Sequence, residues 1–349
     1  PRKPESKIER FHMDIASSVQ KVTEKVLILI LKNLKKELDL DNLCLAGGVA
    51  LNCVANGLIQ KKKIFKKMWI QPASGDAGTS LGAALALWHL HLKNKRFINE
   101  HDSMDGSFLG PRFSEKTIEG KLIKVGANYK KHKTNYINKF IAQKISEGNV
   151  VGWFQGKMEF GPRALGARSI IADPRNKIMQ KQLNLKIKFR EGFRPFAPAI
   201  LECHTEQWFD LDCSSPYMLL VSNLRKNILK KNATSRGIYK TLSLINEVRS
   251  KIPAVTHIDN SARVQTVNKK TNLRFYNLIN EFYKLTKTPI LINTSFNIRG
   301  EPIVCSPEDA FRCFMGTDLD LLVIENFVLE KNKQKKNNKI EYKYLFELD

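Results

Sequence analysis

The sequence VVGWFQGKMEFGPRALGARSIIADPRNKIMQKQLNLKIKFREGFRPFAP occupies residues 150–198. It opens on an apolar run, residues 150–154, that is typical of a buried strand. A glycine-rich loop follows, and a second apolar run at residues 170–172 ends at Asp173 and Pro174. An amphipathic helix pattern then leads into a basic stretch. This order of strand, loop, strand and helix predicts an α/β domain around the segment.

Six basic residues lie close together in this segment, and most sit beside Gly, Pro or Phe: Lys157, Arg163, Arg168, Lys188, Arg190 and Arg194. Cations on rigid loops next to strands suit a phosphate-rich, strongly anionic small molecule. The glycines let backbone N–H groups approach the same oxygens. The alternative is a set of solvated charges on a helix and its loops, which is the usual place of any single Lys or Arg. The clustering favours the anion site.

The length of 349 residues favours two domains, and a hydrophobic content of 42% is enough for a sizeable core. No run of residues approaches the length of a membrane span, and the charged N-terminal residues do not resemble a signal peptide. The six cysteines are scattered and form no CxxC pair. Reduced cysteines in a cytoplasmic protein are therefore expected, and a structural zinc site is not.

A net charge of +24 has three competing explanations: a nucleic-acid partner, an anionic substrate, or a lysine-rich composition bias. Lys and Asn concentrate in the least patterned segments, residues 224–240 and 331–339, and this favours the bias. The sequence shows no RNP-type aromatic motif, zinc finger or recognition helix. A specific nucleic-acid partner is therefore not expected.

The N-terminal residues predict two strand-loop-helix units after a long helix at residues 11–38. In the first unit, a strand at residues 43–45 runs through Gly47 and Gly48 into a helix at residues 50–62. Free N–H groups at such a helix start can bind an anion, and Asn52 would lie in the first turn. A tight turn explains a double glycine about as often.

The second unit has a strand at residues 67–71, a small-residue loop and a helix at residues 81–92. Asp76 lies in the loop between glycine and alanine neighbours. An isolated carboxylate there is suited to a metal ion or to a ligand hydroxyl. Its alternative role is as the N-cap of the following helix. The polar, aperiodic residues 93–107 then predict a domain boundary, which separates residues 1–106 from residues 107–349.

The second domain predicts a helix capped at Ser114 and further helices at residues 135–147, 273–285 and 307–315. Strands are expected at residues 218–221, 289–293, 319–324 and 327–329, and an extended stretch at 252–267 carries His257 and Arg263. Residues 224–240 are predicted to form an exposed loop with a helix. The basic tail after residue 330 is predicted to be disordered. Asn293, Ser295 and Asn297 follow the strand at 289–293, where ligands bind in open α/β sheets.

Six motifs, in order along the chain, are similar to those of one enzyme family. They are AGGVALN (46–52), PASGDAGTSLGAAL (72–85), GKMEFGPRALGARSIIADPRN (156–176), NLKIKFREGFRPFAP (184–198), IPAVTHIDNSARVQTV (252–267) and TSFNIRGEPIVCSPEDA (294–310). Together they resemble the O-carbamoyltransferases of the NodU/CmcH type over residues 46–329. The resemblance implies an α/β chain: a partial actin/hexokinase-like (ASKHA) domain at residues 1–106, followed by a YrdC-like twisted α/β domain at residues 107–349.

The implied reaction has two steps. Carbamoyl phosphate and ATP give carbamoyladenylate, and the carbamoyl group then passes to a hydroxyl of a small acceptor. Family motifs imply catalytic roles for Lys157, Arg163 and Arg168. They imply substrate or nucleotide binding by Gly47, Gly48, Asn52, Lys188, Arg190, Arg194, His257, Arg263, Asn293, Ser295 and Asn297. ATP, Mg²⁺ and a divalent metal, iron in characterised relatives, are the implied cofactors, and Asp76 matches the carboxylate metal ligand.

One departure from the family is large. Members begin with a first half of the transferase domain that carries a histidine pair for the metal, and nothing in this chain matches it. The HDS sequence at residues 101–103 lies in the interdomain linker and is rejected as a counterpart. The chain by itself is therefore expected not to complete the transfer of the carbamoyl group to an acceptor. A threonylcarbamoyladenylate-type synthase of tRNA modification and a basic nucleic-acid-binding module are the alternative functions.

Overall fold

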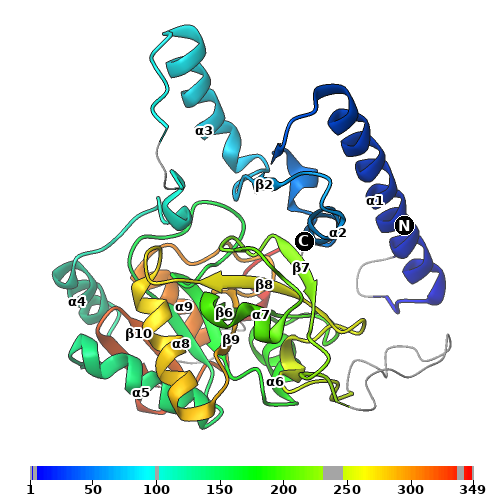
Figure 1. Ribbon diagram of the computed structural model, residues 1–349. Helices are drawn as coiled ribbons and strands as arrows, with labels where there is room; N and C mark the ends of the chain where they lie inside the picture. Colours follow the sequence, from blue (N-terminus) through cyan, green and yellow to red (C-terminus); the bar gives the residue numbers. More distant parts are fainter. Residues whose placement is uncertain (1, 3–5, 99–101, 231–246, 336–341, 348–349) are drawn as a thin grey trace.

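The computed structural model describes residues 2, 6–98, 102–230, 247–335 and 342–347. A large mixed sheet covered by helices makes up most of the molecule, and a smaller N-terminal part stands beside it (Figure 1). The α/β arrangement expected from the sequence is confirmed. Within the described residues, every helix is too short or too polar to cross a membrane.

Among the described residues, the large sheet contains nine strands. In spatial order they are β3 (Lys130–Lys131), β11 (Phe327–Glu330), β10 (Leu321–Ile324), β4 (Val151–Phe154), β5 (Arg168–Ala172), β9 (Ile290–Ser295), β6 (Ala197–Leu201), β8 (Ser261–Val267) and β7 (Leu220–Asn223). The β10–β4 and β6–β8 pairs are parallel, and the other neighbours are antiparallel. Strands β4, β5, β6 and β10 are buried at every residue, which explains why they read as continuous apolar runs.

Helices cover both faces of this sheet (Figure 1). On one face, α5 (Thr134–Ser146) and α8 (Leu273–Thr286) share a cluster that includes Ile171 and Leu291. The opposite face packs Ile170 and Ile292 against α4 (Glu115–Lys124), α6 (Met179–Gln182), the π-helical turn Leu183–Ile187 and α9 (Pro307–Gly316). Alternate residues of one strand therefore serve two cores, as the twofold period of a strand requires. A short helix, α7 (Thr205–Trp208), follows β6.

The N-terminal part contains both expected strand-loop-helix units. Its elements are α1 (Arg10–Leu38), β1 (Asn42–Leu45), a 3-10 turn (Gly48–Leu51), α2 (Cys53–Lys62), β2 (Lys67–Ile70), α3 (Ala77–Ala86) and a π-helical turn (Leu87–His91). The expected helix at residues 50–62 is therefore divided. Asn52 is its N-cap and not part of its first turn, because the Asn52 Oδ1 atom accepts a hydrogen bond from the Ala55 N–H at 3.1 Å.

Large apolar side chains of the N-terminal part remain exposed. They line α1 (Phe11, Ile15, Val19, Val22, Val26, Leu29, Ile30, Leu34, Leu38) and the region of α3 and its π-helical turn (Leu85, Leu87, Trp88, Leu90). Strands β1 and β2 form a parallel pair with no third described strand. Because parallel sheets are normally covered on both faces, this part presents unusually large apolar surfaces to solvent.

The N-terminal part docks against the large sheet through α2. The Asn56 amide donates hydrogen bonds to the backbone carbonyls of Ala50 and Leu219, at 2.8 and 3.2 Å. At Gly57 the backbone of α2 approaches β7 so closely that an added Cβ would lie 2.0 Å from the Val221 carbonyl oxygen. The glycine is therefore what allows the helix and the strand to meet.

Three of the expectations from the sequence concern a strand, a loop and the tail after residue 217. The strand expected at 218–221 is displaced to Leu220–Asn223. Most of the loop expected at residues 224–240 lies outside the described residues. The expected disorder after residue 330 is wrong for the described part of the tail, because Lys331 donates a 2.8 Å hydrogen bond to the Thr317 carbonyl and Tyr342 is buried.

Substituting Gly57→Ala should destabilise the protein by about 2 kcal/mol, because the added methyl group overlaps the Val221 carbonyl. Gly120→Ala is the matched control, since Gly120 also lies inside a helix but has nothing within 4 Å of its added Cβ. Urea unfolding of both variants measures the difference. Equal stability of the two variants would show that α2 does not dock on β7 as described.

Candidate anion-binding site

The residues expected to bind anions meet at a cavity of about 490 Å³, here called the Arg263 cavity. It is lined by seven of the predicted residues: Arg163, Arg190, Arg194, His257, Arg263, Asn293 and Ser295. Arg263 comes from β8, whereas Asn293 and Ser295 come from the last residues of β9. Cys53 and Val54, in the first turn of α2, also line it. The N-terminal part thus contributes to its wall.

A second cavity of about 520 Å³ adjoins the first and is here called the Lys188 cavity. The two share Arg190, Arg194 and Ser295. Two further predicted residues, Lys188 and Asn297, line the second cavity together with Arg299. Five arginines and one lysine therefore border two connected hollows. Such a density of cations suits a ligand that carries several phosphate groups.

The Lys188 ammonium group is fixed by the loop that follows β9. It donates hydrogen bonds to the carbonyl and Oδ1 of Asn297, both at 2.8 Å, and to the carbonyl and hydroxyl of Ser295 at 2.5 and 3.1 Å. The side chain is buried, and burial, together with the nearby Arg190, lowers the pKa of Lys188 to about 7. Its positive charge therefore depends on pH near neutrality.

Arg163 and Arg263 bring like charges to the same cavity. Burial, with repulsion from Arg263, lowers the pKa of Arg163 to about 10, so it remains protonated at neutral pH. The Arg163 Nε atom is buried and has no hydrogen-bond partner among the described residues. An anion bound between the two guanidinium groups would reduce their repulsion and would accept a hydrogen bond from the Arg163 Nε–H group.

His257 and Asn293 supply neutral polar groups. The His257 Nδ1 atom lies 3.0 Å from the Ser261 hydroxyl, and burial lowers the pKa of His257 below its usual value. The Asn293 amide donates to the Ala164 carbonyl at 3.1 Å and to Gln265 Oε1 at 2.7 Å. The Asn293 Oδ1 atom is buried without a described partner. It can therefore accept a hydrogen bond from a ligand N–H group.

Two positioning residues were missed by sequence reasoning. The Glu159 carboxylate accepts hydrogen bonds from the backbone N–H groups of Leu165 and Ala167, at 2.6 and 2.8 Å. The Gln265 side chain holds the same loop by donating to the Leu165 carbonyl at 2.8 Å. Both residues are buried polar groups, which a single sequence does not distinguish from exposed ones. The signal in the sequence was that each residue lies within one of the six family motifs, Glu159 in residues 156–176 and Gln265 in residues 252–267.

Two of the predicted catalytic residues lie outside both cavities. Lys157 is exposed and borders a separate hollow of about 370 Å³ with Arg112 and Arg274. Arg168 is fully buried, with its guanidinium carbon 3.5 Å from the centre of the Phe154 ring. The guanidinium donates to the backbone carbonyls of Pro111, Gln155, Gly156 and Ala167. The structure therefore places Arg168 in the core, where it holds the glycine-rich loop, and not in the anion site.

The remaining predicted residues lie on the N-terminal part. Gly47 has a φ of +91°, which favours glycine, whereas Gly48 begins the 3-10 turn. The Asn52 amide is engaged with Gln20 of α1, which it contacts through a 2.9 Å hydrogen bond. Asp76 is exposed and forms no N-cap hydrogen bond to α3. The structure thus does not bring these residues to the two cavities.

A metal centre cannot be built from the described residues alone. No group of three or more His, Cys, Asp or Glu side chains among them could hold a metal ion. Asp76 by itself is a single carboxylate, which is fewer ligands than a protein metal site uses. We therefore derive no chemical step through a metal on this chain.

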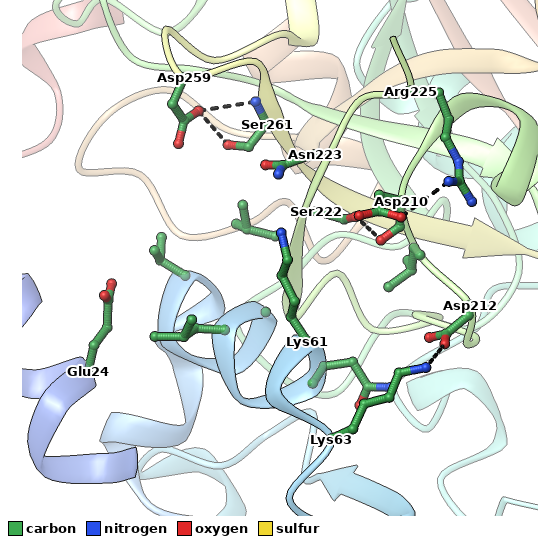
Figure 2. Close-up of a pocket in the computed structure, with 16 residues that line it drawn as sticks. Glu24, Lys61, Lys63, Asp210, Asp212, Ser222, Asn223, Arg225, Asp259 and Ser261 are labelled. Atoms are coloured by element: carbon green, nitrogen blue, oxygen red, sulfur yellow. Dashed lines mark hydrogen bonds and ion pairs between the residues drawn. The ribbon is translucent and has the colours of Figure 1, made fainter. Parts of the chain in front are cut away.

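A further hollow of about 460 Å³ lies between α2 and β7 (Figure 2). Four of its charged side chains form ion pairs: Lys63 with Asp212 at 2.6 Å, and Arg225 with Asp210 at 3.3 Å. Asp259 accepts a 2.6 Å hydrogen bond from the Ser261 hydroxyl. Because four acidic residues line this hollow with only three basic ones, it lacks the excess of cations that marks the Arg263 and Lys188 cavities.

Comparison with known proteins identifies the class. The family described as "Carbamoyltransferase C-terminus" matches residues 142–331, which include most of the residues that line both cavities, and the family described as "Carbamoyltransferase N-terminus" matches residues 2–85. The chain belongs to the carbamoyltransferase family, as its motifs indicated. The domain boundary near residue 106 stays a prediction.

Individual relatives share most of the chain. An uncharacterised protein of Synechocystis sp. is 52% identical over the whole chain, which covers 57% of that relative. The nodulation protein NolO of Bradyrhizobium diazoefficiens is 38% identical over 92% of the chain and 55% of its own length. The nodulation protein NolNO of Sinorhizobium fredii is 37% identical over 92% of the chain and 44% of its own length. The chain thus spans about half the length of these relatives.

Separate substitutions of Arg168 and Arg263 should distinguish a residue that stabilises the fold from one that binds an anion. Arg168→Met should lower the free energy of unfolding by about 3 kcal/mol, because several buried carbonyls lose their donor. Arg263→Met should leave stability nearly unchanged but weaken the binding of inorganic phosphate. Urea unfolding and calorimetric titration test the pair. The reverse result would return Arg168 to the list of ligand contacts.

The thermal stabilisation that inorganic sulfate confers should fall as the pH rises from 6 to 8.5. Lys188 loses its positive charge through this range because its pKa lies at about 7, whereas sulfate keeps the same charge. The Lys188→Met variant should show a flatter pH dependence, and the exposed Lys186→Met control should resemble the wild type. A wild-type profile identical to that of Lys188→Met would contradict this role for Lys188.

Proposed function

We propose that this chain forms carbamoyladenylate from carbamoyl phosphate and ATP, as one part of an O-carbamoyltransferase. Membership of the carbamoyltransferase family supports a carbamoyl donor and an acceptor. The observation that carries the finer proposal is the convergence of Lys188 and five arginines on two adjoining cavities. Carbamoyl phosphate and ATP are together a heavily anionic pair, which such a site would stabilise.

The proposed chemistry begins with water, which hydrolyses carbamoyl phosphate to carbamate and phosphate. A carbamate oxygen then bonds to the α-phosphorus of ATP, the bond from that phosphorus to the bridging oxygen breaks, and pyrophosphate leaves. In the transfer step, an acceptor hydroxyl bonds to the carbamoyl carbon and AMP departs, while the hydroxyl proton passes to solvent. The positioned cations would stabilise negative charge on the phosphoryl oxygens in each step.

Residue roles follow from the two cavities. We assign the phosphates of ATP to the Lys188 cavity, where Lys188, Arg190 and Arg299 face one hollow. Carbamoyl phosphate is assigned to the Arg263 cavity, where Arg163 and Arg263 would hold its phosphate. The unpaired Asn293 Oδ1 atom would accept a hydrogen bond from the carbamoyl NH₂ group. Mg²⁺ would accompany ATP.

The domain names and the transfer step are also part of the proposal. We assign residues 107–349 to a YrdC-like domain and residues 1–106 to part of an actin/hexokinase-like transferase domain. The exposed apolar surfaces of α1 and α3 fit a transferase domain that needs further polypeptide to cover them. A divalent metal for that step would use Asp76 as one ligand and take its other ligands from outside this chain.

The purified chain should catalyse ATP–pyrophosphate exchange that depends on carbamoyl phosphate, without forming a carbamoylated acceptor. Arg263→Met should reduce the exchange rate at least about tenfold, because one charge-assisted contact to phosphate is lost. Radiolabelled pyrophosphate provides the measurement.

Substrate choice decides between this proposal and its alternatives. Exchange with bicarbonate and threonine in place of carbamoyl phosphate would indicate a threonylcarbamoyladenylate-type synthase. Salt-sensitive binding to RNA or DNA, with no exchange under either condition, would indicate a nucleic-acid-binding module. Well-folded protein that supports no exchange at all would contradict adenylate formation by this chain.

A further inference from the structure

The C-terminal residues 342–347 pack against the loop that borders the Lys188 cavity. Gly316, at the end of α9, leaves room for the Tyr342 ring, since an added Cβ would lie 2.2 Å from Tyr342 Cγ. Gly300, with a φ of +77°, approaches the Glu347 carbonyl, and its added Cβ would lie 2.1 Å away. Two glycines thus permit close contact between this segment and the rest of the molecule.

Tyr342 joins this segment to the loop by a hydrogen bond. Its hydroxyl donates to Glu301 Oε1, and Glu301 Oε2 accepts a 2.9 Å hydrogen bond from the Ile298 N–H. Both side chains are about 95% buried. Burial, the neighbouring Cys313 and the bond to Glu301 raise the pKa of Tyr342 above its usual range, so the phenol keeps the proton that it donates.

The same loop holds the Lys188 ammonium group. The Glu301 carbonyl accepts a 2.6 Å hydrogen bond from the Asn297 amide, whose oxygen in turn accepts one from Lys188. The Arg299 N–H donates to the Lys188 carbonyl at 3.2 Å. A continuous set of contacts therefore leads from Tyr342 through Glu301 and Asn297 to Lys188. Arg190, Glu301 and Cys313 are the charged or titratable groups that act on Lys188.

Glu347 places the same segment at the cavity itself. It lines the Lys188 cavity together with Arg190 and Arg194. The segment is therefore a wall of the cavity as well as a support for its loop. Residues 342–347 are distant along the chain from the segments at residues 188–194 and 295–302 that also line this cavity.

We propose that Tyr342 is a positioning residue, which through Glu301 and Asn297 holds Lys188 in place for anion binding in the Lys188 cavity. Tyr342 touches no ligand in this account and acts only through the loop of residues 297–301. The identity of the anion, the phosphates of ATP, rests on the proposed function. The positioning of Lys188 does not.

The test compares wild type, Tyr342→Phe and Tyr344→Phe in the full chain. The Phe variant at 342 keeps the ring against Gly316 but loses the donor to Glu301. Tyr344 is the matched control, because it lies in the same segment and is exposed. Three quantities are measured: the melting temperature, the Kd for ATP by calorimetry, and the pH midpoint of the stabilisation by sulfate.

Tyr342→Phe is expected to weaken ATP binding about tenfold, because a displaced Lys188 would lose one charge-assisted hydrogen bond to the phosphates. It should also move the sulfate midpoint upward from about pH 7, because a loosened Lys188 regains contact with water. A merely structural role would lower the melting temperature without moving this midpoint. Tyr344→Phe should match the wild type in all three quantities.

An unchanged sulfate midpoint in Tyr342→Phe would overturn the proposal, whatever ATP does. A shifted midpoint in a protein that binds no ATP would support the positioning role and count against the proposed function instead. If Tyr342→Phe does not fold, Glu301→Asp decides, because its shorter side chain withdraws the carboxylate from Tyr342 and keeps the negative charge that acts on Lys188. The same upward shift is expected, and its absence would overturn the proposal.

Discussion

The candidate site depends on one buried contact, between the Lys188 ammonium group and the loop that follows β9. Four oxygen atoms of Ser295 and Asn297 surround the ammonium group, so the segment after α6 and the end of β9 are joined at the point where the two cavities meet. A buried ammonium group is costly unless acceptors surround it. These acceptors are neutral, however, so they leave the positive charge available to an anionic ligand.

The surrounding arginines divide into two kinds. The Arg168 guanidinium group donates hydrogen bonds to backbone carbonyls and lies over the Phe154 ring. It therefore stabilises the glycine-rich loop from inside the core. Arg163 and Arg263 instead share a cavity without a neutralising carboxylate among its lining residues. Because no carboxylate neutralises this charge, a bound phosphate would relieve the repulsion between the two guanidinium groups. Stability and binding are thus assigned to different members of one cluster.

Much of this arrangement was predictable from the sequence. The continuous apolar runs at residues 150–154 and 170–172 predicted buried strands, and four of the six cations clustered near them line the two cavities. The sequence did not reveal that Arg168 points inward, because inward and outward residues of a strand buried on both faces look alike. It also did not reveal Tyr342, whose role depends on contacts with Gly316 and Glu301 that are distant along the chain. Asp76 and Asn52 stand apart from the cavities because short motifs do not specify how two parts of a chain dock.

An experimentally determined structure with ATP bound would test the central claim most directly. The account predicts that the phosphates lie in the Lys188 cavity, within hydrogen-bond distance of the Lys188 ammonium and the Arg190 and Arg299 guanidinium groups. Phosphates bound instead in the hollow beside Lys157 and Arg274, with Lys188 still enclosed by Ser295 and Asn297 alone, would contradict it.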